Sequence, residues 1–234
     1  MILGGAEVGR EGFDNGAAVT RSLLGWGVVA GPFYVVVGLV LAFSRPGFDL
    51  SRHALSLLTL GEHGWAQRAN LVLTGLMVLA AAVGAARALR EGRGGAIAAA
   101  LGIFGIGLVG SAIALPDPVA GFPPGSPAPD GVTTHGLLHL ALGAIGFLAL
   151  AVGALTASRW RAGRGERAGA RVSLALGLVV LLGFLGGAAL ATSGLGVALL
   201  WLAVLAGFAW VALISVRFYR HVPHPVLARR TGTT

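Results

Sequence analysis

Residues 195–216 read LGVALLWLAVLAGFAWVALISV, a run of apolar side chains that no charge interrupts. The hydrocarbon core of a bilayer is about 30 Å thick, so a helix that rises about 1.5 Å per residue needs about 20 such residues to cross it. Backbone polar groups find no water there, and a spanning segment must therefore be helical. Five further stretches have similar length and no charge in their interior; they cover residues 24–43, 71–89, 96–115, 137–157 and 172–191. The sequence thus predicts an all-α integral membrane protein with a six-transmembrane-helix bundle.

The composition agrees with a membrane protein. Hydrophobic residues make up 56% of the chain and charged residues only 11%, which is too little polar surface for a soluble fold of this size. The absence of cysteine excludes disulfides, thiolate metal sites and cysteine nucleophiles. The net charge of +8 comes from arginines that lie beside the apolar stretches. Membrane insertion explains such charges, so no nucleic-acid partner is expected.

The arginines predict which way the bundle faces. The chain has 17 of them and no lysine, and 14 lie on one side of the predicted bundle. Cytoplasmic connections of membrane proteins are enriched in such charges. We therefore expect a multi-pass protein of the plasma membrane with both termini in the cytoplasm. The predicted parts are a polar cytoplasmic arm (1–22), a transmembrane domain (23–217) with functional outer loops at 44–70 and 116–134, and a basic cytoplasmic tail (218–234).

A histidine pair opens the fourth apolar stretch. His135 and His139 stand in the sequence HGLLH, and residues four apart lie on one face of a helix. Such a pair can bind a metal ion, or one ring can act as a base while the other orients a substrate. In the alternative interpretation, His135 caps the helix and His139 bonds to a neighbouring helix.

Asp117 ends the third apolar stretch between two prolines, which hold it on a stiff segment. The loop that follows leads to the fourth stretch, so we expect the carboxylate to reach His135 or His139. The three side chains would supply ligands for zinc and leave a fourth position for water. Otherwise Asp117 is a polar helix terminator, and the protein needs no cofactor.

The first outer connection carries further polar groups. His53 and Ser56 together permit nucleophilic chemistry if they touch, which gives both residues a candidate catalytic role. Four nearby residues are candidates for substrate binding: Arg52, Trp65, Asn70 and Thr74. In the alternative interpretation, Trp65 is an interfacial anchor, and Asn70 and Thr74 bond to neighbouring helices.

Several stretches follow one another in a recognisable order. They are GPFY (31–34), SRPGFD (44–49), RHALSLLTLGEHGWAQRAN (52–70), DPVAGFPPG (117–125) and HGLLH (135–139). Over residues 25–217 this series resembles the prokaryotic membrane family catalogued as domain of unknown function 998. The resemblance implies six spans and leaves the activity open; its matching positions are Arg52, Ser56, Gly61, Trp65, Asn70, Gly75, Asp117, Pro123, Gly136 and His139.

Two more distant resemblances bear on function. The layout resembles Frag1/DRAM-type membrane proteins, some of which are linked to lipid remodelling. It is also similar to ceramidase-like membrane hydrolases, which use Ser, Asp and an HxxxH pair around zinc. This chain has six predicted spans rather than seven, and it has no clear third metal histidine unless His53 serves.

Two hypotheses for function follow from these residues. The first is a membrane enzyme that acts on a lipid or isoprenoid substrate at the outer leaflet by His/Asp acid–base chemistry, with or without a metal. Hydrolysis or transfer is favoured over isomerisation or cyclisation. The second is a non-catalytic lipid-binding, assembly or stress-response membrane protein. An enzyme should bring its polar groups together around a cavity, whereas a scaffold would pair them separately with the backbone. The sequence leaves the oligomeric state open.

Overall fold

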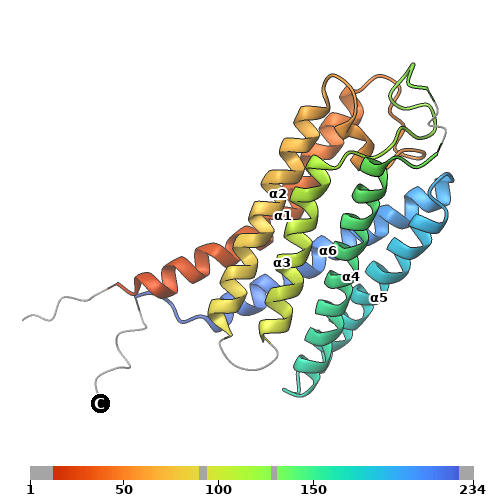
Figure 1. The fold of residues 1–234 in the computed structure, drawn as a ribbon. Coiled ribbons are helices and arrows are strands. Elements are labelled where there is room, and N and C mark those ends of the chain that lie inside the picture. Colours follow the sequence, from red (N-terminus) through yellow and green to blue (C-terminus); the bar gives the residue numbers. More distant parts are fainter. Residues whose placement is uncertain (1–12, 90–93, 128–130, 227–234) are drawn as a thin grey trace, which may run out of the picture.

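The computed structural model describes residues 13–89, 94–127 and 131–226. Within these residues the chain forms six helices long and apolar enough to cross a membrane, joined by loops with one short 3-10 helix (Figure 1). No strand occurs in the described ranges apart from one isolated bridge between Val119 and Phe122. The elements are α1 (Asn15–Ser44), η1 (Leu55–Thr59), α2 (Gly64–Ala88), α3 (Gly94–Ile113), α4 (Thr134–Ala162), α5 (Arg167–Ala189) and α6 (Gly194–His221).

Most of the helices extend beyond the apolar stretches that predict them. Polar residues continue a helix into the head-group region, where water satisfies its terminal backbone groups. The largest difference is at α1, which begins at Asn15 instead of near residue 24. Helix α2 begins at Gly64 instead of near residue 71. Trp65, Asn70 and Thr74 therefore lie on this helix, and the first outer loop is shorter than the predicted range 44–70. Of the predicted arm (1–22) and tail (218–234), residues 1–12 and 227–234 lie outside the described residues.

Each helix packs against the next one in the chain, and α6 returns to pack against α1, so the six helices form a closed ring. Small residues allow the backbones to approach closely. At the α2–α3 contact, a β-carbon placed on Gly75 would lie 2.8 Å from the carbonyl oxygen of Gly105. One on Gly105 would lie 3.0 Å from the carbonyl oxygen of Gly75. These two helices therefore touch through their backbones.

The two ends of the bundle differ in character. The end that we call the loop side carries the α1–α2 loop, the α3–α4 loop and the tight α5–α6 turn (Figure 1). The opposite end, the basic side, carries the first and last described residues, the end of α2, the start of α3 and the α4–α5 connection. This arrangement places the polar residues of the two long loops together at one end of the bundle.

Candidate functional site

His53 lies at the centre of the loop side, where it joins the two long loops. Its side chain is 3% exposed, and its Nδ1 accepts a hydrogen bond of 2.9 Å from the backbone N–H of Asp49. The Nε2 atom must then carry the proton, and it lies 3.3 Å from the carbonyl oxygen of Ala120. The ring packs against both Phe48 and Phe122, each with a centroid separation of 5.3 Å, and these two rings also contact each other at 5.1 Å. Both ring nitrogens are therefore bonded to the backbone.

Arg45, which follows the last residue of α1, contacts the same two loops. Its Nη2 donates to the carbonyl oxygen of Leu60 at 2.7 Å and its Nη1 to that of Leu58 at 3.4 Å. The guanidinium also lies 5.5 Å from the centre of the Phe122 ring. Partial burial lowers the pKa of Arg45. Sequence reasoning counted this arginine only for its charge, although its place at the end of an apolar stretch was visible.

Asp117 connects the end of α3 to the start of α4. Its Oδ1 accepts a hydrogen bond of 2.5 Å from the hydroxyl of Thr133, and its Oδ2 accepts one of 3.0 Å from the Thr133 backbone N–H. The Thr133 hydroxyl oxygen accepts in turn from the N–H of Gly136, which caps α4. A carboxylate at this end of a helix is stabilised by the helix dipole. Asp117 therefore holds the N-cap residue of α4 in place, and it bonds to neither His135 nor His139.

The two histidines of α4 have different surroundings. The Nδ1 of His139 lies 2.8 Å from the carbonyl oxygen of Ala114 at the end of α3, so Nδ1 carries the proton and donates it. His135 is exposed, and among the described residues it forms no hydrogen bond. In the same ranges, no three His, Cys, Asp or Glu side chains lie where they could hold a metal ion. The expected ligand set of His135, His139 and Asp117 is therefore not assembled.

The remaining loop residues do not meet a catalytic partner. Ser56 is half-buried in η1, and its carbonyl oxygen accepts from the hydroxyl of Thr59 at 2.6 Å. Within the described residues the Ser56 hydroxyl has no bond to His53 or to any other group. Arg52 and Trp65 point outward, and Trp65 is 68% exposed. The exposure of Trp65 suits an interfacial anchor.

Asn70 and Thr74 are buried between α1 and α2 and form a small polar network. The Asn70 amide donates to the carbonyl oxygen of Tyr34 at 3.1 Å and to the Oε1 of Gln67 at 3.0 Å. Thr74 donates to the Asn70 oxygen at 3.3 Å, whereas the Gln67 Nε2 has no partner among the described residues. Gln67 is not among the residues predicted from the sequence, although residues 67, 70 and 74 share one helix face. The network supports the interpretation that Asn70 bonds to a neighbouring helix.

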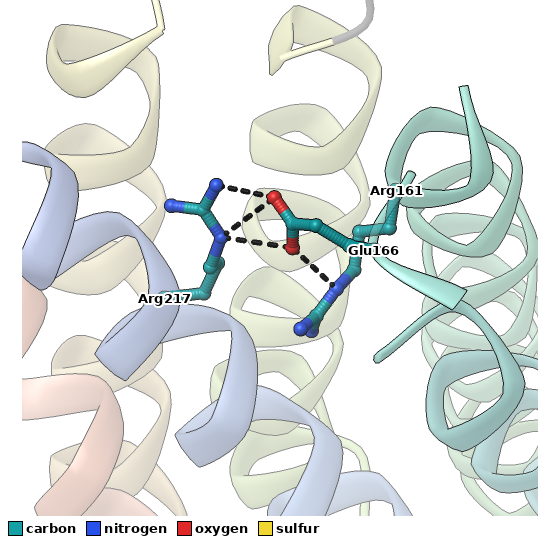
Figure 2. Close-up of polar contacts among 3 residues, drawn as sticks. All are labelled: Arg161, Glu166 and Arg217. Atoms are coloured by element: carbon teal, nitrogen blue, oxygen red, sulfur yellow. Dashed lines mark hydrogen bonds and ion pairs between the residues drawn. The ribbon is translucent and has the colours of Figure 1, made fainter. Parts of the chain in front are cut away.

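A second polar cluster lies on the basic side, where Glu166 stands between two arginines (Figure 2). Arg217 of α6 donates to both carboxylate oxygens, with its Nη2 at 2.5 Å from Oε1 and its Nε at 3.1 Å from Oε2. The Nε of Arg161 in α4 lies 3.2 Å from Oε2 as an ion pair. The hydrogen bonds from Arg217 and the charges of both arginines lower the pKa of Glu166. The sequence predicts only an orienting role for these arginines, although Glu166 is the one acid among the charges of residues 159–171.

A comparison with protein-family models matches residues 28–217 to the family described as "Protein of unknown function (DUF998)". The match begins inside α1 and ends at Arg217, the residue that binds Glu166. No curated protein and no solved structure matches the chain. The comparisons therefore add no support for the more distant resemblance to Frag1/DRAM-type proteins. Because the match spans well over half of the chain, the protein belongs to the DUF998 family, whose description assigns no activity.

Proposed function

We propose that this chain is a non-catalytic membrane protein that binds lipid, and that its loop side is a structural cap on the helix bundle. One observation carries the proposal: the candidate catalytic groups are bonded separately, chiefly to the backbone. His53 bonds to Asp49 and Ala120, His139 to Ala114, and Asp117 to Thr133. Among the described residues no hydrogen bond joins one candidate catalytic residue to another.

Acid–base and nucleophilic catalysis need a different arrangement. A base must lie within hydrogen-bond reach of the nucleophile or substrate proton, and a third group must orient it. Both nitrogens of His53 are occupied, and the Asp117 carboxylate accepts two bonds from Thr133. These interactions hold loops and helix ends in place, which is what a cap requires.

The proposed location follows from the charge pattern. The basic side carries most of the arginines, and by the positive-inside rule this supports the proposal that this side and both termini face the cytoplasm in a plasma-membrane protein. The loop side would then face outward. Membrane lipids are the proposed partners.

One observation keeps the enzyme hypothesis as a second candidate. Because Nδ1 of His139 donates to Ala114, its Nε2 has a free lone pair, and no hydrogen bond involves this atom in the described residues. A backbone carbonyl that fixes the tautomer in this way is also found behind catalytic and metal-binding histidines. In this version, His139 would act as the base on a lipid or isoprenoid at the outer leaflet.

The two candidates differ in what the protein does to membrane lipids. The gene would be deleted from its host and restored as the wild type, as His139→Gln or as Asp117→Asn. Lipids and isoprenoids would then be profiled by mass spectrometry, with the amount and melting temperature of each protein checked. The non-catalytic proposal expects no compound whose amount depends on these two side chains. A product that disappears in both variants, while the proteins remain folded, would make the enzyme the better conclusion.

A further inference from the structure

A groove of about 550 Å³ lies on the basic side between the start of α1 and the end of α6. Its described lining includes Arg21, Trp26, Tyr219 and His224, and none of the lining residues is acidic. We propose that this groove binds one anionic phospholipid, with the head-group phosphate on Arg21 and the first part of an acyl chain along Trp26. This inference deepens the proposed lipid-binding function and rests on it.

Arg21 is held in a geometry that suits a phosphate. Its Nη1 donates to the carbonyl oxygen of Val222 at 2.8 Å and lies 3.4 Å from that of Tyr219. The guanidinium lies over the Tyr219 ring, 3.9 Å from its centre. These contacts fix the plane of the group and use one nitrogen. Nε and Nη2, which form the other edge of the fork, donate to no group in the described residues. This edge can bind two phosphate oxygens at once.

The groove also lies at the depth of a lipid head group. Helix α1 begins at Asn15, nine residues before the apolar stretch 24–43 that is expected to cross the hydrocarbon core, so its first turns extend into the head-group region. Arg21 belongs to these turns. Trp26 and Val29 follow about 7 and 12 Å farther along the helix, and their side chains are 46% and 47% exposed. An amphipathic ring at the boundary and an apolar side chain below it match the two parts of a lipid.

The charges select an anionic lipid over a zwitterionic one. Arg21 is a cation that no carboxylate neutralises among the described residues, since both ion pairs found there involve Glu166. A choline head group would bring a second cation to this edge, whereas a phosphatidylglycerol brings only a negative charge. Basic pockets between helix ends on the cytoplasmic side are a recurring site for such head groups.

Native mass spectrometry of the full chain in detergent would test this proposal. Phosphatidylglycerol and phosphatidylcholine with identical acyl chains would be added in turn to the wild type, Arg21→Gln and Arg159→Gln. Arg159 is an exposed arginine on the same side but outside the groove, so it is a control for net charge. We expect one tight phosphatidylglycerol site that Arg21→Gln weakens about tenfold and Arg159→Gln leaves unchanged.

Because Arg21 also bonds to the end of α6, Arg21→Gln could weaken binding by disturbing the fold. A second variant separates the two effects. Ser22→Asp places a carboxylate in the groove and leaves the Arg21 contacts intact, so it should also weaken phosphatidylglycerol binding at an unchanged melting temperature. Equal binding by all the proteins, an equal loss in Arg159→Gln, or no preference for the anionic lipid would each overturn the assignment. The lipid profile described above measures the amounts of lipids in the host, whereas native mass spectrometry measures lipid binding by the purified protein. Failure of the groove assignment and failure of the non-catalytic proposal can therefore be told apart.

Discussion

The carboxylate of Asp117 lies directly over Gly136, so close that a β-carbon at this glycine would overlap both Oδ atoms and Cγ. The close approach lets Asp117 bind the Thr133 cap while it faces the first turn of α4. The glycine thus creates the space that a residue from another helix end fills. This contact, rather than one with a histidine, explains the placement of Asp117 in the fold.

We expect Gly136→Ala to destabilise the protein by about 1–3 kcal/mol, because the added methyl group must push the Asp117 carboxylate away from Thr133. Thermal unfolding in detergent would measure the loss. Gly143→Ala is the matched control in the same helix, since the nearest atom to its new methyl group would be 3.9 Å away. If the two variants melt at the same temperature, the contact contributes nothing to stability.

His53→Ala should cost roughly 3 kcal/mol, because it leaves a cavity beside two phenylalanine rings and removes the partners of the Asp49 N–H and the Ala120 carbonyl. The two loops should also loosen, which hydrogen exchange at Asp49 would report. His63→Ala is the control, because His63 is an exposed histidine of the same loop. If the His53 variant is as stable as the control, His53 does not hold the two loops of the loop side together.

Glu166→Gln should reduce stability by roughly 1 kcal/mol at neutral pH and by progressively less in acid, a modest value because the ion pairs are partly exposed. The pKa of Glu166 in the folded protein is below its ordinary value of 4.5, chiefly through the Arg217 hydrogen bonds. The stabilisation is therefore complete above about pH 4.5 and is lost as the pH falls through the lowered pKa.

Melting temperatures of the wild type and of Glu166→Gln between pH 7 and pH 3 would show this dependence as a gap that closes in acid. Glu62→Gln, at an exposed position on the loop side, should show no gap at any pH. A gap for Glu166→Gln that stays constant down to pH 3 would mean that the ionised carboxylate is not what stabilises the fold.

The functional roles of the candidate residues stay predictions, but their contacts can be compared with the sequence. The sequence drew attention to Asp117, His139 and Asn70, and each of them makes a specific contact in the fold. It could not show that these contacts go to Thr133, to a carbonyl of Ala114 and to a carbonyl of Tyr34. Backbone carbonyls are present at every position, so a sequence does not reveal which of them a side chain will meet.

The sequence by itself determined the class of fold, because the length and apolarity of a segment decide whether it crosses a bilayer as a helix. The run at 195–216 and its five counterparts became six helices of this kind within the described residues. The tertiary structure alone decided which polar groups meet. His53 and Ala120 are 67 residues apart, and Glu166 and Arg217 are 51 apart. A hydrogen bond forms only when two atoms come within about 3 Å. Such proximity arises from the way the six helices pack and from the paths of the loops that join them.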